Sequence, residues 1–169
     1  MSQGYRAPRV EGDLAFIPLT QGKEAVIDAR DLPLVGSAKW CAKRGQRSFY
    51  ATRSGPRKAD GRQPFIQLHR VIMAASPGQN VDHINLNGLD CRRANLRFAT
   101  MAENSRNRPK QNNNTTGFKG VTLFKGRFQA HIKYERKKIH LGCFATAEEA
   151  HAAYADAAAR LHGQFARVS

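Results

Sequence analysis

Short apolar runs separated by polar turns fill the first half of the chain, and this pattern predicts strands. The strand-like segments are residues 14–18, 25–28, 48–53 and 63–68. A polar turn at residues 20–23 joins the first two. Residues 1–12 show no regular pattern. The start of the chain is therefore expected to be rich in short strands.

Helical and loop segments interrupt these strands. A helical turn is expected within residues 31–40, and residues 68–75 form a short apolar helix that ends at Ser76-Pro77-Gly78. Residues 53–62 are rich in Gly, Pro and basic residues, which is typical of a loop. The pattern of this N-terminal region indicates no chemistry.

The last third of the chain passes from strand alternation to helical periodicity. Residues 127–134 alternate strictly, so the even-numbered residues from Phe128 to Tyr134 share one face, and residues 138–141 repeat the alternation. Thr146 and Glu149 form a capping box, the signature of a helix N-terminus. The apolar residues that follow at helical spacing are mostly alanine, which lets a helix lie close to a sheet.

The net charge indicates which class of partner this protein binds. Lys and Arg number 28 against 13 Asp and Glu, a net charge of +15. Such a balance favours a polyanion, and the absence of a long basic amphipathic helix argues against a membrane surface. In the tail, residues 118–144 hold seven Lys or Arg and one acid, whereas residues 146–162 hold one Arg and three acids. This predicts a basic sheet face backed by an acidic helix; the alternative is a merely solvated face.

The cysteines and the hydropathy indicate where the protein works. Cys41, Cys91 and Cys143 lie far apart and form no CxxC pair, so no zinc site is expected. The N-terminus has no apolar core typical of a signal peptide, and no run reaches the ~20 apolar residues of a membrane span. We expect a cytoplasmic protein with no membrane association.

Candidate chemistry lies in residues 81–85 and downstream of them. Asp82 offers a hard oxygen ligand for a divalent cation, and the adjacent His83 can act as a base near neutral pH. Asn95 follows twelve residues after His83, and Asn104 nine residues after Asn95. An acid, a histidine and two asparagines in this order suit metal-assisted phosphodiester cleavage.

Residues 65–108 resemble the HNH nuclease family, in the variant of phage homing endonucleases where asparagine replaces the last histidine. The resemblance implies a ββα-metal fold in which a helix end faces the strand of Asp82 and His83. Thr100 and Glu103 form a capping box that places Asn104 in the first turns of such a helix.

The resemblance also implies a role for each motif residue. His83 is the general base, Asp82 and Asn104 hold one Mg²⁺ or Mn²⁺, and Asn95 ties the loop that orients the base. An asparagine often stands in place of Cys91 in similar sequences, and little effect on chemistry is expected. Further candidates for catalysis or phosphate binding are His69, Arg70 and Arg97, with Arg92, Arg93, Arg106 and Arg108 as plausible phosphate contacts or plain solvated charge.

From residue 115 onward the sequence resembles the APETALA/ethylene-response-factor DNA-binding domain. Residues 117–121, 141–144 and 146–150 carry this likeness. It implies a three-stranded sheet that lies in the DNA major groove, although the base preference does not carry over. The implied contacts, together with the outer face of residues 127–134, are Lys119, Thr122, Phe124, Lys125, Arg127, Gln129, His131, Lys133, Lys138 and His140.

The sequence thus predicts an α+β protein in three parts. Residues 1–108 hold a β-rich lead-in and the nuclease module, residues 109–116 a linker, and residues 117–169 a three-stranded antiparallel sheet packed on one helix. The expected function is metal-dependent endonuclease action on double-stranded DNA, encoded by a phage or prophage. The alternatives are a non-catalytic DNA-binding regulator with a vestigial motif and, less supported, an RNA-binding protein. The sequence leaves the oligomeric state open.

Overall fold

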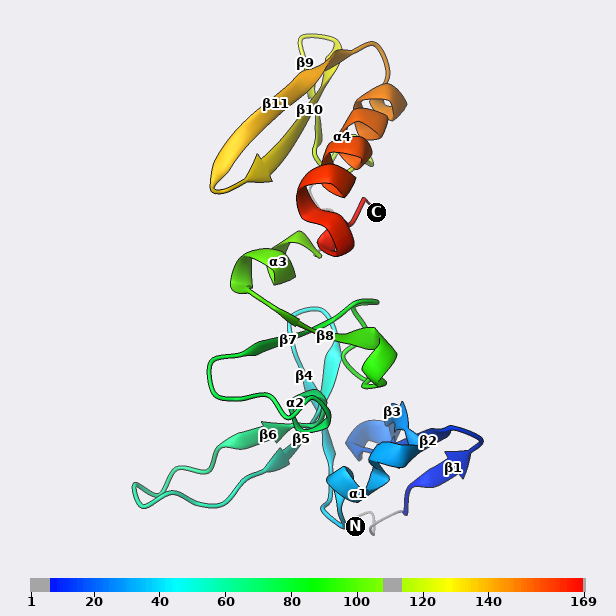
Figure 1. The fold of residues 1–169 in the computed structure, drawn as a ribbon, viewed down its shortest axis with the longest axis vertical. Helices are drawn as coiled ribbons and strands as arrows, with labels where there is room; N and C mark the ends of the chain where they lie inside the picture. The colour runs from blue at the N-terminus through cyan, green and yellow to red at the C-terminus, as the bar shows by residue number, and fades with distance from the viewer. Residues whose placement is uncertain (1–6, 108–113, 169) are drawn as a thin grey trace. The chain divides into compact units, whose positions relative to one another are not determined.

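The computed structural model describes residues 7–107 and 114–168. Several small antiparallel sheets and short helices make it an α+β protein, which confirms the predicted fold class (Figure 1). The chain divides into two compact units, Met1–Thr100 and Met101–Ser169. The predicted linker, residues 109–116, lies mostly outside the described residues. The predicted domain limits stay a prediction.

The first unit opens with a three-stranded sheet in the order β1-β2-β3. Its strands are β1 (Arg9–Glu11), β2 (Leu14–Pro18) and β3 (Glu24–Asp28), followed by the short helix α1 (Leu32–Val35). The second and third strands and the helical turn confirm the prediction. The first strand was not predicted, because its three residues are all exposed and carry no apolar alternation.

A second three-stranded sheet has the order β4-β5-β6 and leads into helix α2. The elements are β4 (Cys41–Arg44), β5 (Phe49–Ser54), β6 (Phe65–Gln67) and α2 (Leu68–Ile72). Strand β4 was missed because Lys43 and Arg44 are both exposed and only Ala42 is buried. The predicted loop at 53–62 corresponds to the long β5–β6 connection (Figure 1).

A two-stranded sheet completes the first unit. Strand β7 (Asn80–His83) pairs with β8 (Leu96–Ala99). The sequence pattern did not predict strand β8. One core joins the three sheets, with Ile17, Ile27, Ala51, Leu68 and Leu96 among its members. The strand that carries Asp82 and His83 is thereby fixed to a packed core.

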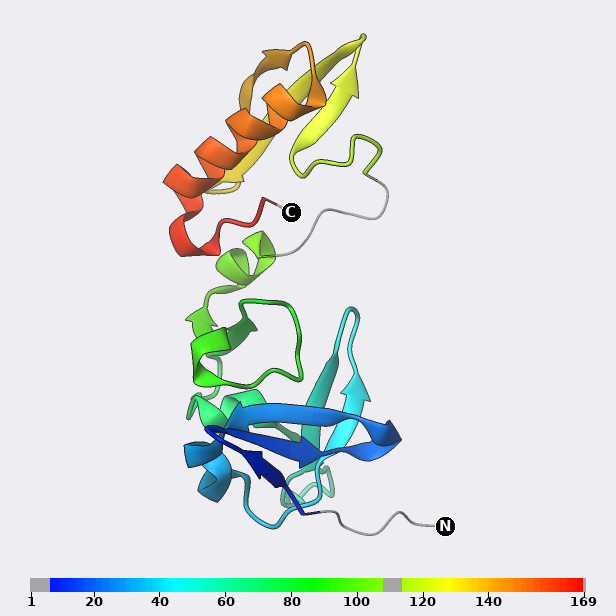
Figure 2. The same ribbon diagram turned by 90° about the vertical axis from the view of Figure 1, so that its right-hand side faces the viewer.

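The second unit contains helix α3, one sheet and helix α4. The elements are α3 (Met101–Arg106), β9 (Val121–Phe124), β10 (Arg127–Tyr134), β11 (Lys137–Phe144) and α4 (Ala147–His162). The sheet order is β11-β10-β9, and α4 packs along one face of it (Figure 2). A three-stranded antiparallel sheet on one helix is thus present, and the capping box of Thr146 and Glu149 is confirmed.

The two faces of the tail sheet are as the alternation predicts. Ala130 and Ile132 are buried under α4, with 0% and 3% exposure. The register shifts by one residue after Ala130, where Leu141 has no partner of its own in β10. Because of this bulge, the outward-facing residues of the two strands stay opposite each other across the shift. In the part of the chain that the structure describes, no helix is long and apolar enough to cross a membrane.

Candidate active site

The β7–β8 pair places Asp82 directly opposite Arg97. The Arg97 guanidinium donates to Asp82 Oδ2 from Nε at 3.0 Å and from Nη2 at 2.8 Å. The carboxylate is 4% exposed and the Arg97 side chain 11%. A buried carboxylate needs such a partner, because an unpaired charge in the interior is very costly. The predicted metal ligand is therefore a buried oxygen donor held in place by an arginine.

His83 follows on the same strand and lies within a cluster of rings. Its ring centroid is 4.8 Å from that of His69 and 5.8 Å from that of Tyr50. Burial lowers the pKa of His83 to about 4, although the carboxylates of Asp82 and Asp90 act in the opposite direction. Burial, and then the neighbouring His83, lower the pKa of His69 to about 3. Both imidazoles are neutral at pH 7, the form in which a histidine accepts a proton.

His83 also contacts Cys91 and Tyr50, two residues for which the sequence predicted no role. Cys91 is fully buried, and its Sγ lies 4.0 Å from His83 Nε2 and 3.9 Å from the Gly88 carbonyl oxygen. Burial raises the pKa of the Cys91 thiol to about 12, so the sulfur stays protonated. Tyr50 comes from β5, more than thirty positions upstream of His83. No local sequence motif predicts that Cys91 or Tyr50 contacts His83.

Asn95 ties the loop that follows His83. Its Oδ1 accepts from the backbone N–H of Asn85 at 3.0 Å, and its Nδ2 donates to Asn85 Oδ1 at 3.0 Å and to the Asp90 carbonyl at 2.8 Å. The Ile84 N–H donates to the Asn95 carbonyl at 2.9 Å. This network restrains the residue next to His83, which is the geometry that the predicted loop-tying role requires.

The same loop lies tightly against the second sheet. A side chain on Gly88 would meet the Phe49 carbonyl oxygen at 2.5 Å and the Tyr50 ring at 2.6 Å. Only glycine fits so close to a backbone oxygen. The Gly88 N–H also donates to Ser48 Oγ at 2.9 Å. Strand β5 is therefore the support on which the loop after His83 rests.

The arginines around the motif are engaged within the protein. Arg92 pairs with Asp90 at 2.6 Å, and Arg93 pairs with Asp31 at 2.9 Å. Arg70 donates to the carbonyls of Gln79 and Ser76, which fixes the turn before β7. Arg108 lies outside the described residues. These contacts give structural reasons for the arginines, and phosphate binding by them stays a prediction.

Asn104 and Lys119 belong to the second unit. Asn104 lies on α3 and is half-buried, and α3 begins directly after Thr100, as the capping box predicts. The predicted shared metal site of Asn104 and Asp82 concerns two different units, so it stays a prediction, as does the ββα arrangement. Lys119 donates from Nζ to the Arg106 carbonyl at 2.7 Å, and burial lowers its pKa to about 8.

A carboxylate and an amide oxygen are hard donors, the kind that Mg²⁺ and Mn²⁺ prefer. In the described part of the chain, no three His, Cys, Asp or Glu side chains gather as a set of metal ligands. The donor chemistry of the predicted pair fits a hard cation. The Arg97 contact means that a cation on Asp82 must share or replace a guanidinium.

The outer face of the tail sheet carries most of the predicted DNA contacts. His131 lies opposite His140, with 3.4 Å between their Nδ1 atoms, and Lys133 lies opposite Lys138. Partial burial, and then the charges of Lys138 and His140, lower the pKa of His131. The other members of this face are Thr122, Phe124, Arg127 and Gln129, and Lys125 lies in the adjoining turn. The face is therefore positively charged and continuous.

We expect acid to destabilise the first unit through His69. The folded pKa is about 3, whereas the unfolded chain returns to the ordinary value of about 6.5. Between these values the unfolded chain binds more protons, so the free energy of unfolding falls as the pH drops below about 6.5. At pH 5 this residue alone costs about 2 kcal/mol. Urea unfolding at pH 7 and pH 5, followed by the fluorescence of the single buried Trp40, measures the effect.

The control for this prediction is His69→Gln, which removes the titrating group. Its free energy of unfolding should be lower than the parent's at pH 7 but should change less between pH 7 and pH 5. An identical pH dependence in the variant and the parent would assign the acid sensitivity to other groups.

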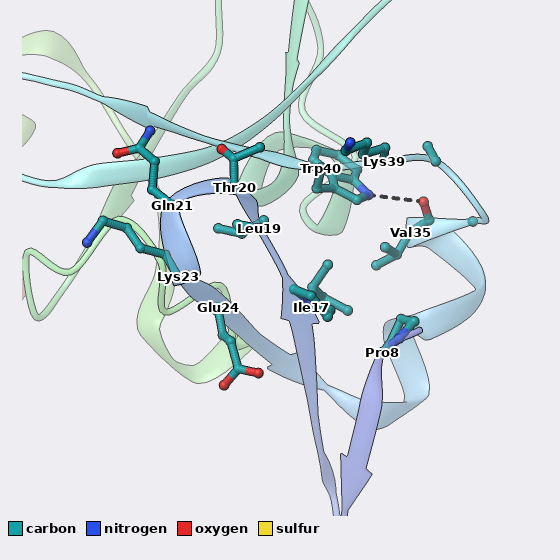
Figure 3. Close-up of a pocket in the computed structure, with 14 residues that line it drawn as sticks. Pro8, Ile17, Leu19, Thr20, Gln21, Lys23, Glu24, Val35, Lys39 and Trp40 are labelled. Carbon is teal, nitrogen blue, oxygen red and sulfur yellow. Dashed lines mark hydrogen bonds between the residues drawn. The ribbon is translucent and has the colours of Figure 1, made fainter. Parts of the chain in front are cut away.

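A separate pocket of about 510 Å³ lies beside the first sheet (Figure 3). Apolar side chains of Ile17, Leu19, Val35 and Trp40 and the polar turn from Thr20 to Glu24 line it. The Trp40 indole donates to the Val35 carbonyl at 3.3 Å (Figure 3). None of the predicted nuclease residues lines this pocket.

Comparison with known proteins adds a family match for the site. No curated protein matches the chain. No solved structure matches it either. Residues 67–106, which include His69, Asp82, His83, Asn95 and Asn104, match the family model described as HNH endonuclease. This match supports an HNH nuclease domain in the chain, and with it hydrolase activity on nucleic acid.

Proposed function

We propose that the protein is a metal-dependent DNA endonuclease of the phage homing type, in which the tail sheet selects the site. The observation that carries this proposal is the placement of His83 beside Asp82 on β7, within the matched residues 67–106. The Asn95 network, which restrains the loop directly after His83, supports it. An acid, a base and an orienting amide are the parts that such a reaction needs.

The chemical step depends on the protonation of His83. Its low pKa keeps the imidazole neutral at pH 7, and the neutral form is the one that can accept the proton of the attacking water. The Tyr50 and His69 rings contact the His83 ring and each other, and the Cys91 thiol lies 4.0 Å from His83 Nε2. These contacts restrict rotation of the His83 ring.

Asp82 is proposed to hold the metal ion. A Mg²⁺ or Mn²⁺ held by Asp82 and Asn104 would neutralise the scissile phosphate and the departing 3′ oxygen. Two hydrogen bonds from Arg97 hold the Asp82 carboxylate in place on its strand. If released from the carboxylate, the same guanidinium could donate hydrogen bonds to a phosphate.

The outer face of β10 and β11 supplies DNA affinity and register. Its cations and histidines point away from α4, and a sheet of two or three strands fits the major groove. Phosphate contacts position a protein on duplex DNA, whereas base-edge contacts select the sequence. We assign both kinds of contact to this face.

Supercoiled plasmid incubated with the protein should be nicked or linearised in Mg²⁺ and left intact with chelator. Asp82→Asn should abolish cleavage while keeping a hydrogen-bond acceptor for Arg97. Asp82→Ala is a poorer test, because removing one partner of a buried ion pair costs about 3–5 kcal/mol of stability. Intact plasmid in Mg²⁺ and in Mn²⁺, together with sequence-selective binding, would favour the alternative of a non-catalytic DNA-binding regulator.

A further inference from the structure

The second sheet of the first unit is more basic than the tail sheet. Residues 39–62 hold eight Lys or Arg and one acid, Asp60, whereas the longer segment 118–144 holds seven and one. The pattern of this segment indicates no chemistry, and the candidate active site uses only Ser48, Phe49 and Tyr50 from it. A charge this concentrated on two hairpins needs an explanation.

The cations gather at the two ends of the sheet. Lys43, Arg44 and Arg47 are exposed at the β4–β5 turn, and the exposed cations of the β5–β6 connection are Arg57, Lys58 and Arg62. The two connections lie at opposite ends of β5 (Figure 1). A strand of six residues spans about 20 Å, the length of about six base pairs of duplex.

The strand register shows which face continues into the candidate active site. Lys43 lies opposite Tyr50, and Ser54 lies opposite Phe65, so these side chains share one face. Tyr50 on that face is the residue that contacts His83. Ala42 and Ala51, on the other face, are buried in the core. The face that carries Lys43 and Phe65 therefore borders the His83 cluster directly.

Lys43 and Phe65 form an exposed pair on this border. The Lys43 ammonium lies 3.7 Å from the centroid of the Phe65 ring, and Phe65 is 60% exposed. Phe65 does not belong to the core of the first unit. The exposed Lys43 ammonium is the group of this pair that can bind a phosphate of duplex DNA.

We propose that the β4–β5–β6 sheet is a second DNA-contacting surface, which holds the phosphates on both sides of the scissile bond. This inference rests on the proposed function and extends its substrate-binding surface into the first unit. The two basic connections bind flanking phosphates, and the Lys43–Phe65 pair binds the backbone next to His83. Duplex DNA fits because the two basic connections lie at the two ends of a strand about 20 Å long, and Tyr50 of that strand contacts His83.

The test is the salt dependence of DNA binding by the full chain. The triple variant Arg57→Gln, Lys58→Gln, Arg62→Gln should reduce the slope of log Kd against log salt by about two to three. Each contact is worth about fivefold in affinity at 0.15 M salt, so binding should weaken by about 10²-fold on all sequences alike. Lys43→Gln should reduce the slope by about one. Unfolding followed by Trp40 fluorescence should be unchanged, because the four side chains are exposed.

A matched control removes three charges elsewhere. Arg9, Arg30 and Arg160 are exposed and lie on β1, after β3 and on α4. Replacing all three with Gln should leave the slope close to that of the parent. Equal slopes for the hairpin triple variant and the parent would overturn the inference. Plasmid cleavage on the same preparations separates the two proposals, since a parent that binds but never cuts rejects only the nuclease.

Discussion

His83→Ala should lower the rate of DNA cleavage by roughly 10²–10⁴-fold, the usual contribution of a general base, and should leave DNA affinity nearly unchanged. The expectation rests on the neutral imidazole beside Asp82 on β7 and on the Asn95 network that restrains the next residues. Single-turnover cleavage of a supercoiled plasmid in Mg²⁺, with binding measured in chelator, separates the chemical step from affinity.

Packing around His83 calls for a second histidine variant. His69 is equally buried and in ring contact with His83, so His69→Gln removes a similar ring without removing the base. Its effect on the rate should be clearly smaller than that of His83→Ala at equal foldedness, measured by Trp40 fluorescence. If His69→Gln abolished cleavage and His83→Ala did not, the roles of the two histidines would be exchanged. Cleavage by His83→Ala at the parental rate would remove His83 from the mechanism.

Local patterns predicted the parts of the fold in which side chains alternate between core and solvent. Residues 127–134 alternate strictly and form β10 with the same limits, and Thr146 with Glu149 marked the start of α4. Strands β1 and β4 escaped prediction because most of their side chains are exposed. Hydrophobic periodicity identifies a strand only where one of its faces is buried.

The motif predicted which residues would matter, but the tertiary structure decides what they touch. The pairing of Asp82 with Arg97 follows from the β7–β8 register, and β8 had no pattern of its own. Tyr50 and Cys91 contact His83 only because β5 and the loop after β7 meet in the folded chain. Contacts between distant segments leave no periodic trace in the sequence. The candidate site could be located from the motif, whereas its ring cluster could not.

Charge counts carried information that the pattern of strands did not. The tail was identified as basic because its charges stand on a visible alternation. Residues 39–62 are more basic still but lie on short strands and turns, and the proposal that they contact DNA depends on the register of β4, β5 and β6. A cluster of cations gains meaning when the face that carries it is known.

We expect the lysines on the outer face of the tail sheet to lower the stability of the fold while they contribute to DNA binding. Lys133 and Lys138 are directly opposite each other on β10 and β11, where like charges destabilise a sheet by a few tenths to about 1 kcal/mol. Replacing either lysine with Ala should therefore leave the free energy of unfolding unchanged or raise it slightly. On the preferred DNA site, Lys133→Ala should cost about 1–3 kcal/mol and relax base preference at one or two positions. Lys138→Ala should weaken all sequences alike and reduce the salt slope by about one.

An inward residue of the same strand provides the control for this face. Ile132 is 3% exposed under α4, so Ile132→Ala should cost about 2–5 kcal/mol of stability and should leave the base preference of the folded fraction as it is. Selection of bound sites from random DNA by each variant, with thermal unfolding on the same samples, separates the three behaviours. If Lys133→Ala selected the same sites as the parent, the central strand would not be reading bases. If both lysine variants lost stability, the two lysines would each make a stabilising contact within the protein. The charge of this face would then be explained by folding and not by DNA binding.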